Sequence, residues 1–299
     1  MAVSSKLSTR SQVKSISLPC RSHPTTIRIE QQLNAAKLDA AAATLPSAQT
    51  VCNGLSQLTE LYKTMDDLLN SSTTRASISR QQNKKWVEDL VEESVKFLDV
   101  CGSTRDMVAQ IKEHITDVHC ALRRRRTSEN NVDCSSIRRK MKKDVKRLVA
   151  SLKEVDNTIG GGSIVVDSDH HQLAAVMKAV VGVSEMTVAV FESLLLFLAM
   201  PVSKPHRWSL VVSKLIHKGM VACDDQQELG ILNEMESIDA GLQALCKDGS
   251  SEKIKTAKCR LERVETQLEC IESGLESVFR RLIGTRTSLL NIMSSYILA

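Results

Sequence analysis

A heptad repeat of apolar residues runs through the C-terminal part of this chain and constrains its fold more than any other feature. From Ile254 onward, positions spaced alternately three and four apart are apolar, and Thr285 alone interrupts the set. Because partner helices must cover so long a stripe, the repeat predicts an all-α protein, either a helical bundle or a coiled coil. The positions are Ile254, Ala257, Leu261, Val264, Leu268, Ile271, Leu275, Val278, Leu282, Thr285, Leu289, Ile292 and Tyr296.

The residue types in the repeat indicate how this helix is covered. One set of core positions holds mostly Leu and the alternate set holds β-branched residues, an order that disfavours a parallel two-stranded zipper. Beyond Val278 the stripe widens, since Phe279, Ile283, Leu290 and Met293 join it. A wide stripe is typical of a helix that several neighbours bury. We therefore expect this helix to pack against other helices of its own chain.

The composition supports a helical, intracellular protein. Aromatic residues make up only 3% of the chain and Pro occurs five times. This favours helices over β-sandwiches and α/β enzymes. The nine cysteines form no Cys-x-x-Cys pair, and no signal-peptide hydrophobic region stands at the start. We expect reduced thiols.

The order of the patterns predicts a disordered, Ser/Arg-rich N-terminal arm over residues 1–26 and a single helical-bundle domain over residues 27–299. The arm also has the composition of an organelle transit peptide. Within the bundle, loops are expected near residues 127–134, 160–168, 200–207 and 247–251. Helices are expected at residues 27–43, 46–70, 86–126, 134–160, 173–199, 208–217, 224–246 and 251–298.

Details of these helices are also predicted. Pro46 suits the first turn of its helix, which should fray from Asn70 to Thr74. Gly102 should kink or briefly break the helix around it, at a cost of about 1 kcal/mol. A helix of about 45 residues is about 68 Å long. We therefore expect an elongated bundle with long, coiled-coil-like helices, mostly antiparallel.

The helix over residues 173–199 is apolar enough to raise the possibility of a membrane span. Lys178, Glu185 and Glu192 interrupt it at intervals of seven, so they share one helix face. Charges within a spanning segment are costly, and a span needs about 20 predominantly apolar residues. A buried core helix is the favoured interpretation.

No pattern in the chain indicates catalysis or metal binding. The triplet Gly160 to Gly162 lacks the Lys-Ser/Thr of a phosphate-binding loop. His114 and His119 lie about 140° apart around a helix, which does not suit a shared metal. Carboxylate pairs such as Glu92-Glu93 are typical of solvated faces. We expect no enzymatic activity, no cofactor and no metal.

One segment is strongly basic. Residues 123–147 carry eleven Lys and Arg against three acidic residues, whereas the whole chain has a net charge of +5. The pattern fits a solvated helix face, a face that binds an anionic membrane or protein, a two-part nuclear import signal, or a phosphate-binding surface. No aromatic residue is interleaved to stack on bases. The candidate residues are Arg123, Arg124, Arg125, Arg126, Arg138, Arg139, Lys140, Lys142, Lys143, Lys146 and Arg147.

Several stretches, in order along nearly the whole chain, resemble a plant-specific family of unknown function that includes the BYPASS-like proteins. They are Ser15-Ile16-Ser17-Leu18-Pro19, Arg21-Ser22-His23-Pro24, Lys85-Trp86-Val87, Leu98-Asp99-Val100-Cys101-Gly102, Arg105-Asp106, Ala121-Leu122-Arg123-Arg124-Arg125, Lys140-Met141-Lys142-Lys143, Phe279-Arg280-Arg281-Leu282-Ile283, Thr285-Arg286 and Ser288-Leu289-Leu290-Asn291.

The resemblance implies a helical protein linked to root and shoot development, with no catalytic residues to carry over. It also weakens the transit-peptide interpretation, because the Ser-Leu-Pro and His-Pro elements belong to the family pattern. We expect a non-enzymatic scaffold or adaptor in development or stress signalling. It would be cytoplasmic, bind unidentified proteins and dock on anionic membrane surfaces. The alternative is a nuclear, nucleic-acid-associated factor that uses residues 123–147, and plastid import is a further possible location.

Overall fold

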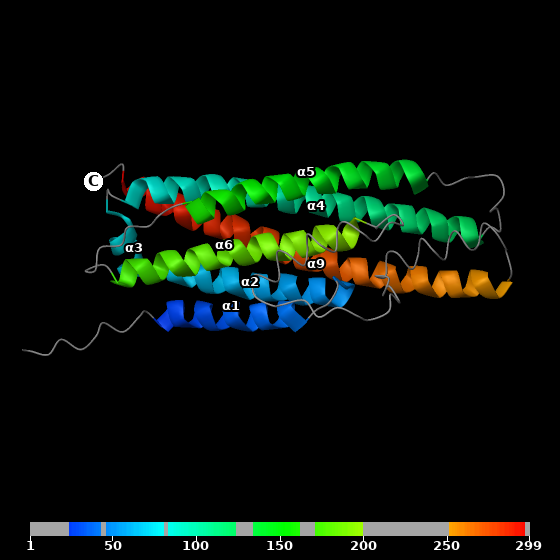
Figure 1. Cartoon of the computed structure of the whole chain (residues 1–299), viewed down its shortest axis with the longest axis horizontal. Helices are drawn as coiled ribbons and strands as arrows, with labels where there is room; N and C mark the ends of the chain where they lie inside the picture. The colour runs from blue at the N-terminus through cyan, green and yellow to red at the C-terminus, as the bar shows by residue number, and fades with distance from the viewer. Residues whose placement is uncertain are drawn as a thin grey trace, which may run out of the picture.

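The computed structural model of the protein describes residues 24–42, 46–80, 83–123, 134–161, 171–199 and 251–296. Within these ranges there are seven helices and no strand, which confirms the all-α class (Figure 1). The expected helices at 208–217 and 224–246, and most of the N-terminal arm, lie outside them. The helices are α1 (Pro24–Ala42), α2 (Ala48–Asn70), α3 (Ser72–Ile78), α4 (Lys84–Arg123), α5 (Cys134–Gly161), α6 (His171–Leu198) and α9 (Ser251–Ser295).

Helix α2 begins with a capping box. The Ser47 hydroxyl accepts a hydrogen bond from the Thr50 N–H at 3.2 Å, and the Thr50 hydroxyl accepts one from the Ser47 N–H at 2.9 Å. These bonds satisfy backbone donors that the first turn leaves without helical partners. Pro46 therefore precedes the cap, and its expected place in the first turn is wrong.

Helix α3 is an element that the sequence patterns did not predict. Ser71 ends α2 by donating its N–H to the Leu68 carbonyl at 3.2 Å, and its hydroxyl caps α3 by accepting from the Thr74 N–H at 3.2 Å. The polar run that we expected to fray is thus a junction between two helices. Short polar helices of this kind carry little apolar periodicity.

Helix α4 is continuous through Gly102, so the predicted short break is wrong. A Cβ added at this glycine would meet no atom within 4 Å. No neighbouring backbone approaches closely enough to require glycine here. The long helix tolerates the weak intrinsic preference of one residue because its burial depends on the rest of the stripe.

Cross-helix contacts place α4 and α9 side by side in opposite directions. Arg105 pairs with Glu276 at 2.5 Å, whereas Lys112, about two helical turns further along α4, pairs with Glu272 at 2.6 Å. The guanidinium of Arg105 also stacks over the Phe279 ring, 5.1 Å from its centroid. Partner numbers fall along α9 as they rise along α4, and Figure 1 shows both helices along the length of the bundle.

Helices α2 and α9, by contrast, run in the same direction. Near the start of α2, Leu55 lies against Gly274, and near its end Asn70 donates to the Ser288 hydroxyl at 3.1 Å. Helix α6 also packs on α2, and α5 packs on α4 and α6. The result is an elongated bundle in which α9 contacts both α2 and α4 (Figure 1).

The heptad positions of α9 form the centre of this core. Every position of the repeat from Ala257 to Ile292 is buried, including Thr285. This confirms that helices of the same chain cover the stripe. Of the residues that widen it, Phe279 and Met293 pack partly against the core, but Ile283 is 46% and Leu290 40% exposed. The expected widening is therefore only half correct, because α2 and α4 cover the heptad stripe and leave the adjacent face to solvent.

Helix α6 is a core helix of the bundle. The segment Gln172–Leu198 is long and apolar enough to cross a membrane by length and composition, yet 67% of its most apolar window is buried in the bundle. Phe191 and Leu194 are fully buried, whereas Lys178 and Glu185 are exposed. The predicted charged face thus points away from the core, and the Lys178 ammonium pairs with Glu30 of α1 at 3.0 Å.

Candidate functional site

Seven of the eleven candidate basic residues belong to α5, which is amphipathic. Its apolar residues recur every three or four positions and are buried against α4 and α6, which fixes the rotation of the helix. They are Met141, Val145, Leu148, Leu152 and Val155.

The basic side chains lie on the opposite side of α5, which we call the basic face. At 100° per residue, Lys143 lies roughly 160° and Lys146 roughly 140° from the mean direction of the buried stripe. Lys153 extends the face by two further turns and is exposed. All members are exposed except Lys142, which is half-buried; they are Arg139, Lys140, Lys142, Lys143, Lys146, Arg147 and Lys153.

The structure gathers six of the eleven predicted residues on this face. Arg138 belongs to α5 and Arg123 is the last residue of α4, but their side chains lie outside the described part of the structure. Arg124, Arg125 and Arg126 lie outside it altogether. The structure thus places the second half of the basic segment on α5 and, of the first half, only Arg123, at the end of α4.

Few acidic groups neutralise the basic face. Asp144 lies 3.5 Å from Arg147 one turn along the helix, and the Lys140 ammonium donates to the Gln110 side chain of α4 at 3.0 Å. Among the residues that the structure describes, Lys142, Lys143 and Lys146 form no ion pair. Such a cluster attracts anions without requiring any existing pair to break.

Burial of the apolar side of α5 limits the chemistry of this surface. An amphipathic helix binds membranes strongly when its apolar face enters the lipid. Here that face is already covered by α4 and α6, so the basic face can act on an intact bundle only through charge and hydrogen bonding. Lys and Arg near an anionic membrane each contribute about 1 kcal/mol.

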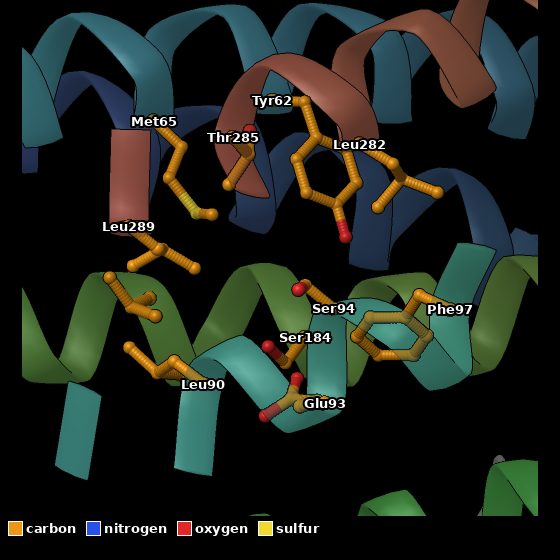
Figure 2. Close-up of a pocket in the computed structure, with 11 residues that line it drawn as sticks. Tyr62, Met65, Leu90, Glu93, Ser94, Phe97, Ser184, Leu282, Thr285 and Leu289 are labelled. Atoms are coloured by element: carbon orange, nitrogen blue, oxygen red, sulfur yellow. The ribbon is translucent and has the colours of Figure 1, made fainter. Parts of the chain in front are cut away.

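A second polar site, which the sequence analysis missed, lies where α2, α4, α6 and α9 meet (Figure 2). It surrounds a cavity of about 20 Å³, room for a single water molecule. Glu93, Ser94, Ser184 and Thr285 line it, together with apolar side chains. Figure 2 shows Glu93 of α4 beside Ser184 of α6. The cavity is too small for an organic ligand or cofactor.

Glu93 has an unusual environment. Burial raises the pKa of its carboxyl to about 7, although a hydrogen bond with Ser184 and the charge of Lys96 both act to lower it. Our interpretation of Glu92-Glu93 as a solvated pair is thus right for Glu92 and wrong for Glu93. The sequence does indicate this burial, because Glu93 lies three residues after Leu90 and four before Phe97, on the helix face that these two buried residues share.

Further hydrogen bonds join the helices around this junction. The Tyr62 and Thr187 hydroxyls lie 2.9 Å apart, and Thr187 donates to the Val183 carbonyl at 2.7 Å, so Tyr62 is the donor to Thr187. Burial raises the pKa of Tyr62. Arg286 donates to the Val91 carbonyl at 2.7 Å and to the Ser94 hydroxyl at 3.0 Å. These satisfied bonds fix the relative positions of four helices.

Comparison with known proteins identifies the family to which the chain is similar. The family model described as Protein BPS1 matches residues 54–292. That range includes most of α2, all of α3 to α6 and nearly all of α9. No curated protein and no solved structure matches the chain. Because the match covers well over half of the sequence, including the basic face and the polar junction, this chain belongs to the BPS1 family, in agreement with the resemblance to the plant-specific BYPASS-like proteins.

Proposed function

We propose that this protein is a non-enzymatic helical scaffold that docks on an anionic membrane surface through the basic face of α5 and binds partner proteins there. Membership in the BPS1 family fits a protein related to plant development. The observation that carries the proposal is the position of Lys143 and Lys146, which lie opposite the buried stripe of α5, with the half-buried Lys142 at its edge. None of the three pairs with a described acid.

The expected mode of binding follows from this geometry. With Met141, Val145 and Leu148 held in the core, attachment would depend on charge rather than on apolar insertion. Such attachment is reversible and weakens with salt, because the screening length falls from about 10 Å at 0.1 M to about 3 Å at 1 M. A scaffold that binds in this way leaves the membrane when its charge is neutralised.

Co-sedimentation of the full-length protein with vesicles tests the proposal. We expect binding to vesicles of phosphatidylcholine with phosphatidylserine and little binding to phosphatidylcholine alone. Simultaneous reversal of three charges should reduce the binding at least tenfold, since each charge contributes about 1 kcal/mol. The variant carries Lys142→Glu, Lys143→Glu and Lys146→Glu.

The matched control reverses three exposed charges on other helices and changes the net charge equally. It carries Lys37→Glu on α1 with Lys255→Glu and Arg263→Glu on α9, all exposed in the structure. The control should retain most of the binding. Equal loss in both variants would indicate a response to net charge alone and would remove the support for a site on α5.

A nuclear, nucleic-acid-associated factor is the alternative function. The same face could contact the phosphates of duplex DNA, but α5 carries no aromatic residue that could stack on bases. Binding to duplex DNA that falls steeply with salt, without binding to anionic vesicles, would favour this alternative. Absence of binding in both assays would leave a scaffold that acts through protein contacts alone.

The proposed location is the cytoplasm with attachment at membranes. A fluorescent fusion of the intact chain in plant cells distinguishes this location from the nucleus and from plastids. The triple variant of α5 should move from membranes to the cytosol, whereas the control variant should not. Accumulation of the wild-type fusion in the nucleus or in plastids would contradict the proposed location.

A further inference from the structure

Helices α2 and α9 approach closely near the start of α2. A Cβ added at Gly274 would stand 3.0 Å from the Leu55 Cβ, nearer than real Cβ atoms normally come. The absence of a side chain at Gly274 therefore leaves room for Leu55 at this level. For comparison, the Cβ atoms of disulfide-bonded cysteines are about 3.5–4.5 Å apart.

One helical turn before this contact, each helix carries a cysteine. Cys52 precedes Leu55 by three residues and Cys270 precedes Gly274 by four. Because the two helices run in the same direction, these residues face each other, as the helical repeat of 3.6 requires. Both cysteines are free thiols, Cys52 half-buried and Cys270 exposed, and Cys270 lies near enough to raise the pKa of Cys52.

We propose that Cys52 and Cys270 form a redox-sensitive pair, which a peroxide oxidises to a disulfide that links α2 to α9. The exposed Cys270 thiolate attacks the peroxide, its sulfur gains one oxygen as a sulfenic acid, and one water leaves. The Cys52 sulfur then attacks the Cys270 sulfur, which forms the S–S bond and releases a second water. The two sulfurs lose two electrons in total, and the peroxide gains them.

The two cysteines have distinct roles in this sequence. Burial, together with the neighbouring thiol, raises the pKa of Cys52 to about 12, so Cys52 stays protonated and reacts slowly with the oxidant. Its proton is lost only in the second step, where it leaves with the Cys270 hydroxyl as water. Cys270 is the accessible partner and reacts first. Cys259 is likewise exposed on α9 and serves as the comparison.

A disulfide at this position would have a structural effect. It would connect two helices that are far apart in the sequence and would enclose α3 to α6 in one covalent loop. Cross-links that close long loops restrict the unfolded chain and raise stability, provided that they do not strain the native fold. Disulfides of intracellular proteins are usually transient and regulatory, so oxidation would reversibly lock the contact between α2 and α9.

The experiment treats the reduced full-length protein with hydrogen peroxide, blocks the remaining thiols and identifies linked peptides by mass spectrometry. The expected product is a peptide pair joined through Cys52 and Cys270, abolished by dithiothreitol and accompanied by a rise in the melting temperature of a few degrees. The variants Cys52→Ser and Cys270→Ser should lose both the linkage and the rise, whereas Cys259→Ser should keep both.

Two results would overturn the proposal. One is oxidation of Cys270 to sulfinic or sulfonic acid in the wild type with Cys52 still alkylated as a free thiol. The other is linkage of Cys270 to a different cysteine. Both are read from the wild-type protein, so they decide the question even if a serine variant fails to fold.

Discussion

The Thr285 hydroxyl of α9 donates a hydrogen bond to the Asp66 carboxylate of α2 across 2.6 Å. Thr285 is the one polar residue in the heptad of α9, and its side chain is buried. Asp66 is half-buried, and burial raises the pKa of its carboxyl while the bond from Thr285 acts to lower it. The interruption of the apolar repeat is therefore a partner for a carboxylate on the neighbouring helix.

Replacement of Thr285 by Val should destabilise the protein, although it makes the heptad repeat of α9 more apolar. Thr285→Val keeps the shape of the side chain but leaves the half-buried Asp66 without its donor, at an expected cost of about 1–2 kcal/mol. The free energy of unfolding in urea measures this cost. Thr287→Val is the control, because the Thr287 hydroxyl is exposed and bonds only to the Ile283 carbonyl of its own helix. Equal effects of the two changes would contradict the role of the Asp66 bond.

Two leucines of α9 test how the helix is covered. Leu275 is fully buried, whereas Leu290 is 40% exposed. Leu275→Ala should cost about 2–5 kcal/mol because it removes contacts and leaves a cavity. Leu290→Ala, the same substitution on the same helix, should cost less than about 1 kcal/mol. Thermal or chemical unfolding measures both costs. A cost for Leu290→Ala above about 1 kcal/mol would show that another surface covers Leu290 in solution.

Glu93 should make the stability depend on pH near neutrality. The pKa of its carboxyl rises from the ordinary value of 4.5 to about 7 on folding. Between these values the folded protein binds more protons than the unfolded chain, so the stability should fall as the pH rises through this window, by about 1–3 kcal/mol. Unfolding curves in urea from pH 4.5 to pH 8 measure the change.

The matched variants separate Glu93 from the other carboxyl groups, including Asp66, whose pKa is raised in the same direction. Glu93→Gln removes the titration and should make the protein more stable than the wild type at pH 8, with little difference near pH 4.5. Glu92→Gln changes the exposed neighbour and should leave the wild-type profile unchanged. Parallel profiles for the wild type and Glu93→Gln would show that Glu93 is solvated.

Arg286 should not be replaceable by lysine. One of its guanidinium nitrogens donates to both the Val91 carbonyl and the Ser94 hydroxyl of α4. A lysine keeps the charge but lacks the planar, preorganised donors, so Arg286→Lys should cost about 1–2 kcal/mol in the free energy of unfolding. Arg280→Lys, at an exposed pair within α9, should change it by less than about 0.5 kcal/mol. An unchanged stability for Arg286→Lys would contradict the structural role of the pair of bonds.

The all-α fold and the course of α9 could be predicted because the heptad repeat is a local property of the sequence. Which apolar residues of α9 its neighbours bury could not be predicted fully, because Ile283 and Leu290 are as apolar as the buried residues beside them. Only the positions of α2 and α4 decide which side of the helix is buried. Helix α3 was missed for a related reason, since Ser71 defines it through hydrogen bonds rather than through apolar periodicity.

The basic face was predictable as a run of charges, but its relation to the core was not. The buried positions of α5 follow from its spacing of apolar residues, whereas the absence of described acidic partners for Lys143 and Lys146 depends on which helices pack nearby. The pairs Cys52–Cys270 and Asp66–Thr285 lay beyond sequence analysis for a stronger reason. Each depends on the register between two helices at opposite ends of the chain.

The most direct test of the account is hydrogen exchange of α5 in the full-length protein, with and without vesicles that contain phosphatidylserine. Docking through the basic face requires the protein to bind while Met141, Val145 and Leu148 remain in the core, and this has a measurable consequence. It predicts that the amides around residues 141–152 exchange as slowly in the bound protein as in the free protein, or more slowly, because binding to the folded state stabilises it. Faster exchange of these amides on binding would show that α5 leaves the bundle to insert into the lipid. That result, or absence of binding, would contradict docking through the basic face of an intact bundle.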